Sequence, residues 1–142
     1  MNTTELTRKL QALAVKRDVW PSSIDEATLG AMLFDAARTI AVDHDVTERV
    51  ATDALYAWIS GNGSMLRYDA VELRRLLVDW QFIERDGFGR AYRRSAAHPA
   101  RFAEVIAVAA TIDFSRLINE ARARDGEIRA ARKAAYVRQL AA

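Results

Sequence analysis

The sequence contains no cysteine and only two histidines among its 142 residues. The absence of cysteine excludes disulfides and thiolate metal sites and agrees with a reducing compartment. With His44 and His98 as the only imidazoles, no spacing of a nucleophile, a base and an orienting group is visible. We therefore expect a protein that is not an enzyme and that has no metal site and no cofactor.

A long hydrophobic run is also missing. No stretch reaches the roughly 18 uncharged apolar residues that a membrane-spanning helix needs, and Glu5, Arg8 and Lys9 stand where a secretory signal would be apolar. The hydrophobic fraction of 51% and the charged fraction of 28% are ordinary for a globular chain. We expect a cytoplasmic protein without membrane contact, folded as a single domain over residues 1–142.

Charge is unevenly spread, although the net charge is only +2. Residues 116–142 hold seven basic and three acidic side chains, whereas residues 1–58 hold six basic and nine acidic ones. Eighteen of the 21 basic residues are arginine, whose planar guanidinium suits bidentate contacts to phosphate or carboxylate. A GC-rich genome would favour arginine in the same way, so the arginine content alone does not decide the partner.

Asp43, His44 and Asp45 are three potential metal ligands in a row. Adjacent side chains cannot all converge on one ion without distortion. Asp45 followed by Glu48 instead has the spacing of a capping box at a helix start. We expect helix capping here.

The stretch from Tyr68 to Arg94 predicts a helix that leads directly into a β-hairpin. Asp69, with Glu72 three residues later, forms a variant of the capping box. Large apolar residues then recur at the spacing of one helical face, which we expect in the core. These residues are Leu73, Leu76, Leu77 and Trp80.

Two short β-prone segments follow this helix, residues 82–85 and 91–93, with Asp-Gly-Phe-Gly between them. Two glycines and an aspartate between strands indicate a hairpin loop of about four residues. A helix that feeds an arginine-bearing hairpin is typical of a winged helix.

Apolar periodicity predicts further helices on both sides. The expected fold is mainly α with one β-hairpin: a winged-helix-like core over residues 23–98, an N-terminal helix and linker over 1–22, and a helical extension over 99–142. Capping residues place the first helix start at Thr3 or Thr4 and the second at a capping box formed by Ser23 and Glu26.

The first helix, about fourteen residues long, carries one narrow leucine stripe that suits docking on a partner. Trp20 is expected to cover the core. Beyond Pro99 a helix with a break near Asp113 is expected, and Asp125-Gly126 is expected to separate a last basic helix, Glu127 to Leu140. Such a helix packs by one edge onto its own body or onto a second copy, so a homodimer through the terminal helices is one expectation.

The central stretch VELRRLLVDWQFIERDGFGRAYRR resembles the bacterial DUF2087 family over about residues 46–94. The matching positions are Leu73, Arg74, Arg75, Leu77, Val78, Asp79, Ile83, Arg85, Asp86, Gly89, Arg90 and Tyr92. Members of that family occur alone or fused to helix-turn-helix regulators, and no activity is established for them. The resemblance therefore implies a context linked to transcription.

Binding to duplex DNA needs several cations on one surface, because affinity arises largely from counterions released off phosphates. The hairpin places three arginines close together, and no acidic residue occurs between Gly87 and Arg101. Double-stranded DNA is therefore the expected partner of a transcription regulator, with the hairpin on backbone phosphates and the helix near the groove. The candidate DNA-binding residues are Arg67, Arg74, Arg75, Arg90, Arg93 and Arg94.

The outer face of the predicted helix leaves a second interpretation open. Glu72 and Asp79 stand three residues before and four after Arg75, the spacing of ion pairs within a helix. Arg74 is equally open to a structural ion pair. Two valines also face outward, and valines mixed with acidic residues suit a protein surface better than an anionic groove. The alternative is a protein-interaction or dimerisation module built on the same scaffold.

Overall fold

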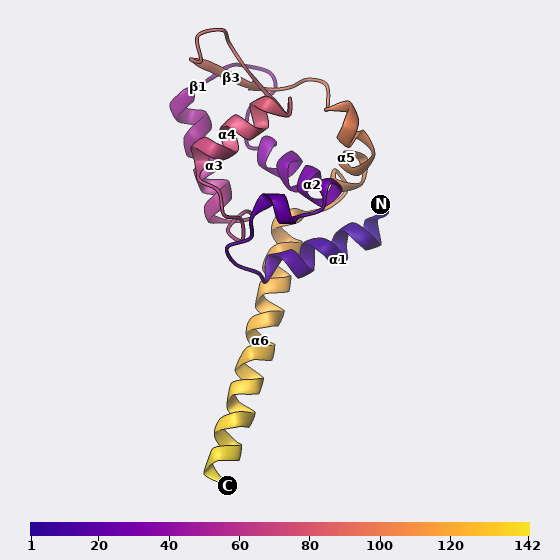
Figure 1. Ribbon diagram of the computed structural model, residues 1–142, viewed down its shortest axis with the longest axis vertical. Helices are drawn as coiled ribbons and strands as arrows, with labels where there is room; N and C mark the ends of the chain where they lie inside the picture. Colours follow the sequence, from indigo (N-terminus) through magenta and orange to yellow (C-terminus); the bar gives the residue numbers. More distant parts are fainter.

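Three short strands form an antiparallel sheet in the order β1-β3-β2, and six α-helices make up most of the remaining chain (Figure 1). This computed structural model describes residues 1–142. None of its helices has the length and apolar character that crossing a bilayer requires. The elements are α1 (Thr3–Ala14), η1 (Pro21–Ser23), α2 (Glu26–Ala37), β1 (Val46–Thr47), α3 (Glu48–Ser60), α4 (Ala70–Asp79), β2 (Ile83–Arg85), β3 (Ala91–Arg94), η2 (Ala100–Phe102), α5 (Ala103–Ala109) and α6 (Phe114–Ala141).

The elements from α2 to β3 follow one another in the order of a winged helix: helix, strand, two helices, then a two-stranded hairpin. Strand β3 lies between the other two, with Tyr92 opposite both Val46 of β1 and Arg85 of β2. Helix α4 packs against α3 and leads into β2. The expected class, mainly α with one β-hairpin and extra helices at both ends, is confirmed.

Strand β1 differs from the sequence prediction, in which a helix begins after a capping box at Asp45. Val46 pairs with β3, and the N-cap of α3 is Thr47, whose Oγ1 accepts a hydrogen bond from the backbone N of Val50 at 3.2 Å. Asp45 pairs instead with Nε of Arg93 at 3.0 Å. Pairing with a strand distant in sequence therefore moves the helix start by two residues.

Two other helix starts also differ from the prediction. The N-cap of α1 is Asn2, whose Oδ1 accepts from the backbone N of Glu5 at 2.9 Å. The N-cap of α2 is Asp25, whose Oδ2 accepts from both the backbone N (3.1 Å) and the Oγ1 (2.9 Å) of Thr28. Ser23 cannot cap α2 because it belongs to the 3-10 turn η1 and donates its hydroxyl to the carbonyl of Trp20. Amide and carboxylate oxygens satisfy the free N–H groups of a first turn as well as hydroxyls do.

Helix α1 packs on its own chain, against α5 and α6. Its leucine stripe, Leu6, Leu10 and Leu13, is buried in the core, to which residues from Leu6 to Ala121 contribute. The sequence prediction that this stripe docks on a partner is therefore wrong. The local sequence of an apolar stripe is the same whether a partner protein or a distant helix of the same chain covers it.

Helix α6 is continuous from Phe114 to Ala141, so the predicted separation at Asp125-Gly126 does not occur, whereas the predicted break near Asp113 does. A glycine inside a helix costs about 1 kcal/mol, which a long helix tolerates. An ion pair between Asp125 and Arg129 (2.9 Å) joins the residues on either side of Gly126. The first turns of α6 bury their apolar face against the body. Residues 126–142 are all exposed and project away from it (Figure 1).

Arg122 fixes the base of α6 to two other helix ends. Its Nε donates to the carbonyl of Ala14 at the end of α1 (3.1 Å), its Nη1 to the carbonyl of Gly61 beyond α3 (3.1 Å), and its Nη2 to Oγ of Ser64 (2.8 Å). Carbonyls at helix ends lack partners within the helix, and a guanidinium satisfies them. Partial burial lowers the pKa of Arg122 from its ordinary value.

Gly30 of α2 is expected to tolerate no side chain. A Cβ at this position would lie 2.4 Å from Cδ1 of Phe102, and Phe102 is itself stacked on Trp80 and Phe82 with ring centroids 5.5 Å apart in each case. We expect Gly30→Ala to lower the free energy of unfolding by about 1–3 kcal/mol through overpacking, measured by urea denaturation. Gly126→Ala is the matched control, because a Cβ there meets nothing within 4 Å. Equal stability of the two variants would contradict the packing.

Candidate nucleic-acid interface

Helix α4 is the helix that leads directly into the β2–β3 hairpin. Its capping box forms as predicted: the backbone N of Glu72 donates to Oδ1 of Asp69 at 2.7 Å, and this backbone hydrogen bond lowers the pKa of Asp69. Leu73 and Leu77 are fully buried. The outer face presents exposed residues of mixed chemistry: Val71, Glu72, Arg75 and Asp79.

Arg75 is exposed and forms no ion pair, although Glu72 and Asp79 have the spacing for one. Its guanidinium is therefore available to a partner. This differs from the interpretation that its charge is used within the helix. Exposed ion pairs of this kind contribute so little free energy that the side chain need not adopt them.

Arg74 lies inside the molecule, with 9% of its surface exposed. Its Nη1 donates to Oγ1 of Thr52 at 2.7 Å and lies 3.1 Å from Oε1 of Glu48, and its guanidinium lies 5.2 Å from the ring centroid of Tyr92. It thus connects α4, α3 and β3. These contacts remove Arg74 from the predicted DNA surface and fit the alternative prediction of a structural ion pair.

Arg67 precedes α4 and is exposed. Its backbone is held by a bridge between two loops: the N of Arg67 donates to the carbonyl of Val19, and the N of Val19 donates to the carbonyl of Met65, both at 2.8 Å. This bridge brings Trp20 beside Arg67, with the guanidinium 4.4 Å from the ring centroid. The Trp20 side chain is 55% exposed, so the prediction that it covers the core is wrong. The sequence around Trp20 does not reveal the bridge to the loop of residues 65–67, which holds Trp20 at the surface.

The wing, defined as residues 86–90 between β2 and β3, is a tight turn closed around Asp86. The backbone N of Arg90 donates to Oδ1 of Asp86 at 2.8 Å, the N of Gly89 donates to the Asp86 carbonyl at 3.1 Å, and the N of Asp86 donates to the carbonyl of Ala91 at 3.0 Å. The hydrogen bond from the Arg90 amide is the main cause that lowers the pKa of Asp86. Gly89 has φ +68°, which a residue with a side chain rarely adopts.

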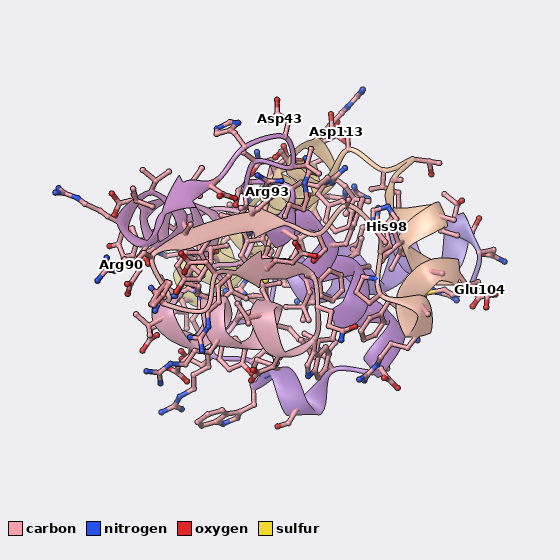
Figure 2. The ribbon with its side chains drawn as sticks, turned by 90° about the horizontal axis from the view of Figure 1, so that it is seen from above. Asp43, Arg90, Arg93, His98, Glu104 and Asp113 are labelled. Atoms are coloured by element: carbon pink, nitrogen blue, oxygen red, sulfur yellow. The ribbon has the colours of Figure 1, made fainter.

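Arg90 is exposed at the outer end of the hairpin, whereas Arg93 lies further along β3 toward the middle of the molecule (Figure 2). Arg93 forms the ion pair with Asp45 that is described above, which holds it against the loop before β1. Arg94 is half-buried, and its Nε is buried without a hydrogen-bond partner. Of the three hairpin arginines predicted to bind DNA, Arg90 is the one that is both exposed and without an acidic partner.

Asp43, His44 and Asp45 do not converge. Nδ1 of His44 lies 2.8 Å from Oδ1 of Asp43, while Asp45 pairs with Arg93 on the sheet. No group of three or more histidine or acidic side chains in the structure has the arrangement of a metal site.

Of the six arginines predicted to bind DNA, the structure thus leaves three exposed without an acidic partner: Arg67 before α4, Arg75 on its outer face and Arg90 on the wing. Acidic side chains stand between them in sequence, among them Glu72 and Asp79. Two exposed aromatic side chains each lie beside one of these arginines: Trp20, which the sequence interpretation placed over the core, and Phe88, which it overlooked.

A family model described as an uncharacterized protein conserved in bacteria (DUF2087) matches residues 19–94. The match begins before the stretch of residues 46–94 that carries the resemblance in sequence, and it includes Trp20 and α2. It coincides with the winged-helix order from α2 to β3, whereas α1, α5 and α6 lie outside it. No curated protein and no solved structure matches the chain.

Proposed function

Because the chain belongs to the DUF2087 family, whose description assigns no activity, we propose its function from the fold and its surface: a non-enzymatic, DNA-binding transcription regulator of the winged-helix type. The observation that carries the proposal is the set of three exposed arginines without acidic partners, Arg67, Arg75 and Arg90, on the elements that a winged helix turns toward a duplex. In this proposal, Arg67 and Arg90 contact backbone phosphates on either side of α4, and Arg75 lies near the groove.

The affinity for duplex DNA should fall steeply with salt, because each phosphate contact releases condensed counterions. We expect the variant Arg67→Ala/Arg75→Ala/Arg90→Ala to lower the slope of log affinity against log salt by roughly one for each arginine removed. Fluorescence anisotropy with a labelled duplex of mixed sequence measures this slope.

Arg138→Ala is the matched control for the loss of a positive charge. Arg138 lies near the end of α6, and the wing and that end lie at opposite ends of the long axis of the molecule (Figure 1). Equal and feeble affinities at low salt for the wild type and the triple variant would contradict the proposal.

A second candidate function is a dimerisation or protein-interaction module, and the free half of α6 favours it. Residues 126–142 are exposed along their whole length, yet they carry several large apolar side chains. A single helix of this length is marginal in water without packing. The apolar side chains are Ile128, Tyr136, Val137 and Leu140. Since α1 is buried in the body, only α6 of the two terminal helices remains available for a homodimer.

Removing residues 126–142 is expected to convert a dimer into a monomer and leave the body folded, because none of these residues belongs to the core. Light scattering over a range of concentrations gives the mass of both chains, and circular dichroism checks the fold. A full-length chain that stays monomeric at every concentration and captures no protein would exclude this candidate.

A further inference from the structure

Phe88 at the tip of the wing is the most exposed large apolar side chain of the protein, at 84%. Single exposed apolar residues are common on protein surfaces, so exposure alone does not indicate a binding role for Phe88. Two further observations do: hydrogen bonds close the wing around Phe88, and the guanidinium of Arg90 lies beside its ring.

The hydrogen bonds around Asp86 close the wing into a tight turn, as described above. The turn also stands clear of the body, because a Cβ added at Gly87 or Gly89 would meet nothing within 4 Å. The Phe88 ring therefore has no apolar surface of its own chain to cover it. A preorganised turn reduces the entropy lost when such a side chain binds a partner.

The neighbour of the ring is a cation. The Arg90 guanidinium lies 5.9 Å from the centroid of the Phe88 ring, and Arg90 has no acidic partner. The carboxylate of Asp86 is occupied by the backbone N of Arg90. The tip thus joins an exposed apolar ring to a free positive charge.

We propose that Phe88 enters the minor groove of duplex DNA and partly unstacks one base step, while Arg90 contacts the flanking phosphates. This inference rests on the proposed DNA-binding function and assigns a role to a residue beyond it. The minor groove is narrow, its floor is formed by the edges of stacked base pairs, and phosphates line both of its sides. An apolar ring can therefore insert between two base pairs while the cation beside it contacts a phosphate. Apolar side chains act as such wedges in other minor-groove binders and kink the duplex.

The test uses a duplex of about 20 base pairs with 2-aminopurine in a central TA step, a step that unstacks easily, and a dye at each end. Unstacking raises the 2-aminopurine fluorescence, and bending raises energy transfer between the dyes. We expect the wild type to produce both signals. Phe88→Ala should lose both and bind roughly five- to tenfold more weakly, with an unchanged salt slope and melting temperature. Phe88→Leu should keep most of both signals, and Arg90→Ala should lower the slope.

The possible outcomes separate the two proposals. If the wild type binds with a steep salt dependence but Phe88→Ala gives the same fluorescence and energy transfer, the wedge is wrong and DNA binding stands. The wedge is also wrong if Phe88→Ala binds more weakly while both signals persist. If the wild type binds no duplex at any salt concentration, the proposed function fails and the wedge fails with it.

Discussion

Asp35→Ala is expected to lower the free energy of unfolding by about 3–5 kcal/mol, because it leaves one buried donor and two partly buried donors without their acceptor. The Asp35 carboxylate on α2 is buried and accepts from Nε1 of Trp58 at 2.8 Å, from Nδ2 of Asn62 at 2.9 Å and from Nη2 of Arg38 at 2.5 Å. It therefore ties α2 to the end of α3, the helices that precede and follow β1 along the chain. Arg38 is partly exposed and adds less to the cost than the buried indole does.

Urea denaturation followed by tryptophan fluorescence measures this loss. Asp53→Ala is the control, because Asp53 is exposed and its nearest cation, Arg49, lies 3.9 Å away. A change within about 0.5 kcal/mol is expected there. A loss below about 1 kcal/mol for Asp35→Ala would show that the carboxylate does not hold the two helices together.

Arg74→Ala is expected to destabilise the protein by about 2–3 kcal/mol, because it removes a charged hydrogen bond to Thr52 and leaves Glu48 without its cation. Packing of the arginine stem is lost as well. Glu48 is half-exposed and is rehydrated in the variant, so the cost stays below that of a fully buried pair.

Arg75→Ala is the control at the adjacent position. We expect it to leave stability within about 0.5 kcal/mol and to lower the salt slope of DNA binding by roughly one, whereas Arg74→Ala should leave that slope unchanged. Denaturation and anisotropy on both variants check this division of roles. If Arg74→Ala were as stable as the wild type and bound DNA with a reduced slope, its placement inside the molecule would be wrong.

The sequence is most informative where structure depends on neighbours along the chain. The capping box at Asp69 and the leucine face of α4 follow from spacing alone, and the glycines of the wing follow from turn chemistry. These local signals place a helix followed by a hairpin in the central stretch. The matched family covers this stretch and extends further toward the N-terminus.

Features that depend on distant contacts could not be predicted from the sequence. Strand β1 has only two residues and exists because β3 pairs with it. Arg74 and Arg75 are adjacent in sequence, and only the position of α3 decides that the first is buried. Trp20 is held at the surface by the loop that carries Arg67.

The candidate site shows the same limit. The sequence predicts six arginines on one DNA surface, and the structure leaves three of them exposed and unpaired. Arg93 is held by an acidic residue on another segment, which no spacing rule reveals. The glycines on either side of Phe88 predict a turn, but they do not predict that the Phe88 side chain is exposed.

The proposed function requires the wing and α4 to form one surface for duplex DNA. The most direct measurement is a titration of isotope-labelled protein with duplex DNA of mixed sequence, followed by amide chemical shifts in NMR spectra. We expect the shifts to concentrate in residues 86–90 of the wing and in residues 67–75, and we expect no response from α1 and α5. No shift at low salt, or shifts confined to the free half of α6, would contradict the proposed function.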